Sequence, residues 1–309
     1  MTLVRLPAVR PSFVRPILVA NLVGEIVIVI TGGIVRLTGS GLGCPTWPEC
    51  VPGSFTPVPH QEEGIHKLIE FGNRTLTGVV GLLALACVWV VFTRMRRRRP
   101  LLLVAVGLVA GVLLQAVVGG IAVRMTLSPV VVAFHFLLSM VMIALSTMLL
   151  RGSEDGWSSD GTADHLEPRE LLVPHLVSTL AWVTAGVCAA VLVLGTIVTG
   201  SGPHSGDAEQ PARTGFDPRS VAWLHADVVM LFVGLVVAVL VAVWLTSSSD
   251  RAKATWRGVL LVTLLQGAIG YVQYFTGLPE VLVGLHMLGA SLLVVTMVLG
   301  VMNLRSNPL

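Results

Sequence analysis

Two histidines of this chain lie inside long apolar segments, each at the same place in a repeated pattern. The pattern is a Leu-Leu-Gln triplet followed by a glycine and then a histidine, at Gln115, Gly119 and His135 and again 151 residues later at Gln266, Gly270 and His286. An imidazole among Val, Leu and Phe side chains costs free energy unless something binds it, and neutral imidazole is a common ligand of metals and of haem iron. The repeat indicates a duplicated chain in which each half buries one potential iron ligand.

The composition indicates that a lipid bilayer surrounds these histidines. Of the 309 residues, 54% are hydrophobic and only 12% are charged, far from the values of a soluble globular domain. A helix needs about 20 mostly apolar residues to cross the hydrocarbon layer. Eight runs meet this requirement, and they cover residues 16–35, 65–92, 101–124, 130–150, 174–199, 221–245, 256–275 and 281–303.

The basic residues gather on one side of the predicted membrane segments, which the positive-inside rule makes cytoplasmic. They precede the first run, join the second to the third and the sixth to the seventh, and follow the eighth: Arg5, Arg10, Arg15, Arg94, Arg96 to Arg99, Arg251, Lys253, Arg257 and Arg305. We expect a multi-pass protein of the cell membrane with both termini in the cytoplasm. The net charge of +3 is explained by this topology and needs no nucleic-acid partner.

Four membrane helices in each half insert in the same direction, so a pseudo-two-fold axis along the membrane normal should relate the halves. The predicted fold is all-α: an integral membrane protein with eight transmembrane helices in two four-helix bundles. Residues 1–150 form the first bundle, 151–173 a cytoplasmic linker and 174–309 the second bundle. A second repeated string, Thr-Gly-Ser-Gly at 38–41 and 199–202, has an offset of 161 residues and should end the first helix of each half at the outer face.

Three histidines share one predicted depth, about five or six residues inside the outer ends of their helices. They are His135, His225 and His286. A facing pair of histidines in a helical bundle can clamp a haem. We expect His225 and His286 to be the two axial ligands in the second bundle, and His135 to supply one ligand in the first.

The partner of His135 is not a histidine at the matching position. Asn73 lies 152 residues before His225, and an amide is a poor axial ligand of haem iron. His66 lies seven residues earlier, on nearly the same helix face but about 10 Å closer to the outer surface. Either His66 is the second ligand after a shift of its helix, or this iron has one histidine and an open sixth position, as a substrate haem would need.

Glu70 is the residue of this helix most suited to catalysis. It shares the inward i, i+4, i+7 stripe with His66 and Asn73. A carboxylate at the edge of a bilayer is expensive and indicates a functional site. The alternative is a structural salt bridge with Arg74 or Lys67.

Three arginines lie near the outer membrane edge, where a guanidinium can pair a haem propionate bidentately. They are Arg36, Arg74 and Arg124. As arginines that extend to the membrane interface they would need no such role.

Two cysteines in the first outer loop are expected to form a disulfide. Cys44 and Cys50 flank five residues that include two prolines, on the side of the membrane where disulfides persist. The bridge is either a structural staple or an exposed, reducible electron relay.

The residues resemble the haem A synthase family over almost the whole membrane-embedded chain. The most specific match is the string at 32–50, Gly-Gly-Ile-Val-Arg-Leu-Thr-Gly-Ser-Gly-Leu-Gly-Cys-Pro-Thr-Trp-Pro-Glu-Cys, and Ile-Glu-Phe-Gly-Asn-Arg at 69–74 and the three deep histidines add to it. The resemblance implies that a methyl group of haem O is oxidised to a formyl group, which gives haem A for cytochrome oxidase. It also implies that Glu70 is essential to catalysis, that the first bundle takes haem O, that haem b in the second relays electrons, and that the cysteine pair takes part in electron transfer.

One departure from the family pattern concerns the first bundle. Many members have a histidine where this chain has Asn73, and the combination of this asparagine with a histidine one turn before the glutamate is similar to an actinobacterial branch. The resemblance keeps Glu70 as the catalytic residue and leaves His66 open as an iron ligand.

Two other classes of protein use parts of the same pattern. A quinol-oxidising dihaem cytochrome b would use the same histidines, but it needs a second ligand in place of Asn73. A proton-coupled transporter would explain the membrane carboxylates Glu25, Glu70 and Asp227, but not histidines at matched depth. The sequence leaves open the electron acceptor, a quinone among the candidates, the oxygen source, the oligomeric state, and any partnership with haem O synthase or cytochrome oxidase assembly factors.

Overall fold

The computed structural model describes residues 8–95, 98–154, 170–207 and 211–306, and its regular elements are eight long helices. They are α1 (Pro11–Leu37), α2 (His66–Arg94), α3 (Arg99–Arg124), α4 (Pro129–Ser153), α5 (His175–Ser201), α6 (Pro218–Thr246), α7 (Asp250–Phe275) and α8 (Glu280–Met302). Each is long and apolar enough to cross a membrane. The eight predicted runs are confirmed, and the chain is an all-helical, multi-pass membrane protein.

Two helices begin before their predicted first residues because polar side chains cap them. α7 begins at Asp250, since the Ser249 side chain accepts a hydrogen bond from the Ala252 amide (3.2 Å). α6 begins directly after Asp217, whose exposed carboxylate accepts from the Ser220 amide (2.9 Å). The hydrogen bonds from Ser220 also lower the pKa of this carboxyl. A hydropathy pattern ends at the first polar residues, whereas a capped helix begins among them.

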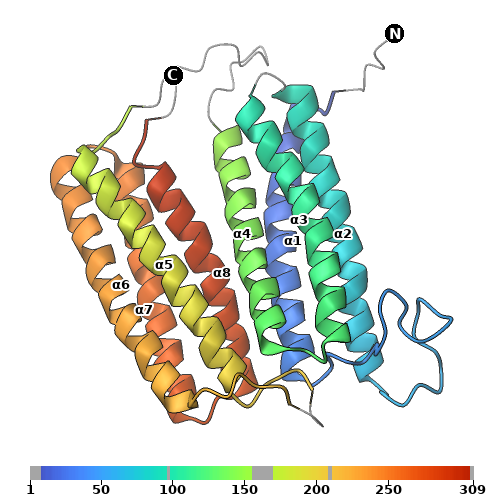
Figure 1. The fold of residues 1–309 in the computed structure, drawn as a ribbon. Helices are drawn as coiled ribbons and strands as arrows, with labels where there is room; N and C mark the ends of the chain where they lie inside the picture. The colour runs from blue at the N-terminus through green and yellow to red at the C-terminus, as the bar shows by residue number, and fades with distance from the viewer. Residues whose placement is uncertain (1–7, 96–97, 155–169, 208–210, 307–309) are drawn as a thin grey trace.

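The helices form two groups, α1 to α4 and α5 to α8 (Figure 1). Consecutive helices pack together within each group, and α1 and α4 of the first group contact α8 of the second. The start of α1 and the end of α8 lie at the same end of the molecule (Figure 1). Most of the predicted linker, residues 155–169, lies outside the described residues, and α4 itself continues to Ser153.

The buried positions of the first half recur in the second at constant offsets. The offset is 163 residues between α1 and α5, 152 between α2 and α6, and 151 between α4 and α8. The two Thr-Gly-Ser-Gly strings, 161 residues apart, are not equivalent in this frame: the first follows the end of α1, whereas the second begins with the last residues of α5. The predicted register of these strings is wrong by two residues, because α5 stays helical through a sequence at which α1 has already ended.

Polar contacts join the two groups at both ends. On the side of the first outer loop, the Arg36 guanidinium donates to the carbonyls of His204 (2.8 Å) and Thr199 (3.1 Å). At the other end, the buried Arg151 of α4 donates to the side chain of Asn303, directly after α8 (2.7 Å). These contacts fix how the two groups of helices sit against each other.

Gly111 in α3 makes space for a side chain of α4, and the preceding turn offers a matched control. A Cβ at position 111 would overlap the fully buried Met142 thioether, whereas a Cβ on Gly107 would meet only Leu145 Cδ1, at 3.9 Å. Overpacking a core costs about 1–3 kcal/mol. We expect Gly111→Ala to lower the thermal unfolding midpoint in detergent and Gly107→Ala to leave it unchanged or raised. Equal midpoints for the two variants would contradict this packing.

Candidate functional site

Each of the three deep histidines packs against a glycine of the preceding helix. The pairs are Gly119 with His135, Gly195 with His225, and Gly270 with His286, and in each a Cβ on the glycine would lie 3.4 Å from the imidazole Cε1. That distance is at the short end of ordinary van der Waals contact, so each ring lies directly against its glycine. The glycines thus provide the room in which these rings lie between helices.

The repeated glutamine fixes the backbone that carries the histidine. Gln115 of α3 donates through Nε2 to the carbonyl of His135 (3.2 Å) and to Ser139 Oγ (2.7 Å). Gln266 of α7 donates in the same way to the carbonyl of His286 (2.9 Å). The repeated residues therefore have the same structural role in both halves. The glutamine holds the helix turn that contains the histidine, and the glycine leaves space for the imidazole ring.

The three imidazoles share a buried ring nitrogen, and their role as iron ligands stays a prediction. The Nδ1 atoms of His135, His225 and His286 are buried without a hydrogen-bond partner. An unpaired buried polar atom costs about 1–3 kcal/mol, so three repeat-related instances need an explanation. Rings kept available for an iron would give one, and these residues fit a haem in each bundle.

Asn73 occupies the fourth place of this arrangement. A Cβ on Gly32 of α1 would lie 3.9 Å from Asn73 Nδ2, as Gly195 of α5 faces His225. Asn73 Oδ1 accepts a hydrogen bond from Thr31 Oγ1 (2.7 Å), which anchors the amide to α1. The side-chain amide of Asn73 thus packs between α1 and α2. The first bundle has one deep histidine, whereas the second has two.

His66, the other candidate for this ligand, lies away from that level. It is the first residue of α2, and its Nδ1 atom is 2.8 Å from Ser40 Oγ in the outer loop. The seven residues between it and Asn73 correspond to about 10 Å along the helix. The structure gives the His66 ring a loop partner, and its role as an iron ligand stays a prediction.

Glu70 is buried at the outer end of α2, with 5% of its surface exposed. Its Oε2 atom accepts a hydrogen bond from the Cys44 amide (2.6 Å), and its Oε1 atom accepts from Arg74 Nη2 (2.6 Å) and Nε (3.0 Å). The salt bridge with Arg74 that the sequence left as an alternative is present, whereas Lys67 donates to two loop carbonyls instead. Three donors hold the carboxylate in one orientation.

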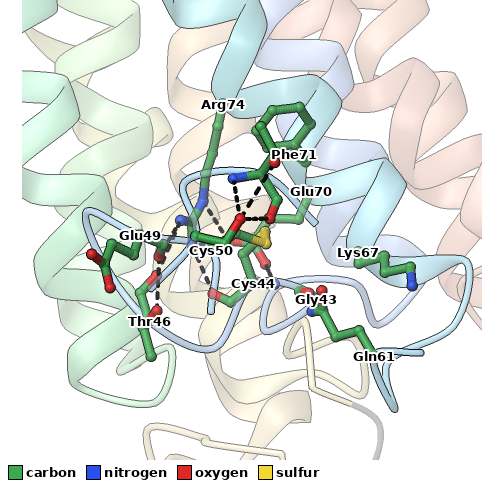
Figure 2. Close-up of a disulfide and its surroundings, with 12 residues drawn as sticks. Gly43, Cys44, Thr46, Glu49, Cys50, Gln61, Lys67, Glu70, Phe71 and Arg74 are labelled. Atoms are coloured by element: carbon green, nitrogen blue, oxygen red, sulfur yellow. Dashed lines mark hydrogen bonds and ion pairs between the residues drawn. A yellow bond between two sulfur atoms is a disulfide. The ribbon is translucent and has the colours of Figure 1, made fainter. Parts of the chain in front are cut away.

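The Arg74 guanidinium holds the segment between the two cysteines. Besides Glu70, it binds the backbone carbonyls of Cys44 (2.7 Å), Thr46 (3.0 Å) and Glu49 (3.4 Å), as Figure 2 shows. A guanidinium has five N–H donors, and these contacts engage all of them. In this arrangement Arg74 has no donor left for a haem propionate.

The other two arginines singled out in the sequence also bind backbone carbonyls. Arg124 donates to the carbonyl of Trp47 (3.0 Å), and its guanidinium carbon lies 5.8 Å from the centre of the Trp47 ring. Arg36 joins the two halves through His204 and Thr199. Both guanidiniums have N–H groups beyond those used in these bonds, and their pairing with propionates stays a prediction.

The predicted disulfide between Cys44 and Cys50 is present, but it is not exposed, because both cysteines are fully buried. It lies beside Glu70 under the loop that Arg74 holds (Figure 2). The same loop docks on α3, where a Cβ on Gly120 would overlap the Trp47 indole. Of the two alternatives left open by the sequence, the exposed relay does not match this structure, because contacts to α2 and α3 close the loop over the sulfur atoms. A redox role for the buried bridge stays a prediction.

The second half has small or apolar residues where the first half has this assembly. At the offset of 152 residues, Pro218, Ala222 and Ala226 stand in place of His66, Glu70 and Arg74. The halves share the helices, the glycines and the deep histidines, and they differ in the carboxylate, the arginine and the disulfide loop. The buried carboxylate of Glu70 therefore has no counterpart at the equivalent position of the second half, and the outer end of the first bundle is the candidate catalytic site.

The fold and these histidines define a class of protein, integral membrane proteins with two four-helix groups whose deep histidines fit haem. Residues 15–206 match the family described as cytochrome oxidase assembly protein (COX15-CtaA). The match covers more than half of the chain, which therefore belongs to this family.

Curated relatives of the chain carry the name haem A synthase. The relative from Halalkalibacterium halodurans is 25% identical over 303 residues, which are 92% of this chain and 95% of the relative. The relative from Alkalihalophilus pseudofirmus is 25% identical over 84% of both chains. A third, from Exiguobacterium sibiricum, is 35% identical over 38% of this chain and 39% of its own. The family inferred from the sequence is confirmed, and the actinobacterial branch stays a prediction.

Arg74→Gln should open the loop over the disulfide. The substitution removes the donors to three loop carbonyls and to Glu70. We expect reduction of the Cys44–Cys50 bridge by a water-soluble phosphine to be about tenfold faster, which corresponds to opening that is easier by about 1.4 kcal/mol. Thiol labelling followed by mass spectrometry measures the rate, and Lys67→Gln, which removes a neighbouring cation, should leave it unchanged. Equal rates in both variants would contradict the clamp.

Proposed function

We propose that this protein is a haem A synthase, which oxidises a methyl group of haem O to a formyl group and so supplies haem A for cytochrome oxidase. The observation that carries the proposal is the difference between the halves. Both fit a haem, but among the residues that the structure describes only the first half has a buried carboxylate and a closed disulfide loop at the outer end of its bundle. Membership of a cytochrome oxidase assembly family and relatives named haem A synthase support the same activity.

The second bundle would hold haem b between His225 and His286. The two rings face glycines of α5 and α7, and their Nδ1 atoms have no protein partner. Haem b, when bound, supplies one-electron redox chemistry. The chain contributes position: Gln266 fixes the turn that carries His286. Alanines at 222 and 226 place neither a carboxylate nor a guanidinium at the positions equivalent to Glu70 and Arg74.

The first bundle would bind haem O as its substrate through His135. Asn73 stands where the second bundle has His225, and Thr31 holds its amide in place. A single histidine binds iron less firmly than a facing pair, as suits a molecule that must enter as substrate and leave as product. The presence of Asn73 at the position equivalent to His225 also disfavours a quinol-oxidising dihaem cytochrome, because that protein needs two firm ligands at each haem.

Glu70 would act on the substituent that is oxidised. Withdrawing electrons from a methyl group leaves positive charge at that carbon and requires protons to leave, and a nearby carboxylate assists both. Arg74 and the Cys44 amide hold the carboxylate before substrate binds, so it need not reorganise during the reaction.

Glu70→Gln keeps the shape of the side chain and removes its charge. We expect haem A formation to fall by about a hundredfold or more, while bound haem b stays at the wild-type level. Pigments extracted from cells that also make haem O, separated by chromatography, measure both. Glu62→Gln, in the same outer loop at an exposed position, is the matched control. Normal haem A in the Glu70 variant would contradict the catalytic role.

Single histidine replacements should separate the two sites. We expect His225→Ala or His286→Ala to deplete bound haem b, because each removes one of its two ligands. His135→Ala should retain haem b and lose haem O, while His60→Ala in the outer loop should retain both. Reduced-minus-oxidised spectra of the purified variants, with pigment extraction, measure the occupancy of each site. Equal loss of haem b in the His135 and His286 variants would contradict the assignment of the two bundles.

A further inference from the structure

A second polar cluster lies deep inside the first bundle, apart from Glu70 and the outer loop. It consists of Asn21 and Glu25 on α1 and Ser146 on α4, with 1%, 4% and 2% of their surfaces exposed. Asn21 Nδ2 donates to Ser146 Oγ (2.9 Å). Asn21 Oδ1 and Glu25 Oε1 are buried and have no hydrogen-bond partner. Two polar oxygens one helical turn apart are thus left unsatisfied in the middle of a membrane helix.

Such atoms are costly, and the fold does not require them. Each unpaired buried polar group costs about 1–3 kcal/mol, and a lone carboxyl costs more. At the equivalent buried positions the second bundle has Thr184, Cys188 and Met297. The Thr184 hydroxyl is satisfied by the carbonyl of Leu180 (2.8 Å). The second bundle is therefore built on the same plan without unsatisfied oxygens at this depth.

The cluster lies below the level at which the first bundle would bind its haem. The Asn21–Ser146 bond links α1 to α4 at one depth. From there Thr31, which binds Asn73, is ten residues along α1, and His135 is eleven residues along α4. Both counts give about 15 Å, so Asn73 and His135 share one depth.

Glu25 lies between these two levels. It is six residues from Thr31 along α1, or about 9 Å deeper in the membrane. This distance is comparable with that from the iron of a porphyrin to a substituent at the edge of its ring. A group attached to the inner edge of a haem held by His135 would thus extend toward Glu25, with Asn21 one helical turn deeper.

We propose that Asn21 and Glu25 bind the hydroxyl group of the hydroxyethylfarnesyl substituent of haem O, and so distinguish haem O from haem b. The inference rests on the proposed function, since it concerns the substrate of the same site. A hydroxyl has one donor and can also accept, so it can donate to Asn21 Oδ1 and accept from Glu25 when that carboxyl carries a proton. Haem b has a vinyl group at that position of the ring, and the second bundle has Cys188 and Met297 there.

The test compares haematohaem with haem b, neither of which has a farnesyl chain. Haematohaem has hydroxyethyl groups where haem b has vinyl groups, so the two differ in the hydroxyl under test. The full-length protein with haem b bound in its second bundle is titrated with each, and the Soret band reports binding to the first. A hydrogen bond to a charged or polar partner is worth about 1.4 kcal/mol, so we expect the wild-type preference for haematohaem to fall about tenfold in Glu25→Leu and in Asn21→Leu.

Control variants separate recognition from packing. Glu25→Gln keeps a donor and an acceptor at the position and should restore most of the preference, and Cys188→Ala in the second bundle should leave it unchanged. A structural carboxyl would lower the thermal unfolding midpoint when lost. A recognition site predicts the opposite for Glu25→Leu, because the variant removes an unpaired buried polar group: an unchanged or higher midpoint together with a lost preference.

The outcomes distinguish this inference from the function on which it rests. An unchanged preference in both leucine variants, or a loss as complete in Glu25→Gln as in Glu25→Leu, would overturn the hydroxyl site and leave the haem A synthase assignment in place. If the wild-type protein bound no haem O beside haem b, the proposed function itself would fail.

Discussion

A polar atom within the hydrocarbon layer has no water to bind, so the protein must supply its partner or keep the atom for a ligand. This constraint orders the whole structure. At one extreme Arg74 uses all five of its donors on Glu70 and the outer loop, which closes the first bundle over a buried disulfide. At the other extreme the Nδ1 atoms of three deep histidines have no protein partner. Arg74 thus builds the scaffold, and the three histidines mark where a ligand is expected.

The two halves show how a duplicated scaffold can acquire two roles. The parts that position a haem are common to both: a glycine facing each deep ligand position, and a glutamine that holds the helix turn in α4 and α8. The parts that differ are polar in the first half and apolar in the second. Glu70 and Arg74 correspond to alanines, and Glu25 corresponds to Cys188. An enclosed pair of histidines suits a resident redox group, whereas one histidine with polar groups at both edges suits a substrate that must be recognised and turned over.

Much of this could be predicted from the sequence, because hydropathy and residue spacing are local properties. The eight helices, the buried histidines and the disulfide follow from windows of about 20 residues or less. What the sequence missed depends on contacts between distant segments. The sequence did not indicate a role for Gly32 and Gly195, because each packs against a residue of another helix, Asn73 and His225 respectively. The burial of the disulfide likewise depends on docking to α2 and α3, and no pattern within the loop reports it.

The interface between the halves accounts for how two sites of different character work as one unit. The residues that directly follow two of the deep histidines, Phe136 and Met287, both pack into the apolar cluster between α1, α4 and α8. Gly33, next to the glycine that faces Asn73, lies against the Met287 thioether, where a Cβ would come within 2.8 Å of the sulfur. The contacts made by Arg36 and Arg151 secure this interface at both ends. Since tight packing leaves little room for relative movement, the fold itself sets the separation of the two sites, as the proposed electron transfer between haem O and haem b would require.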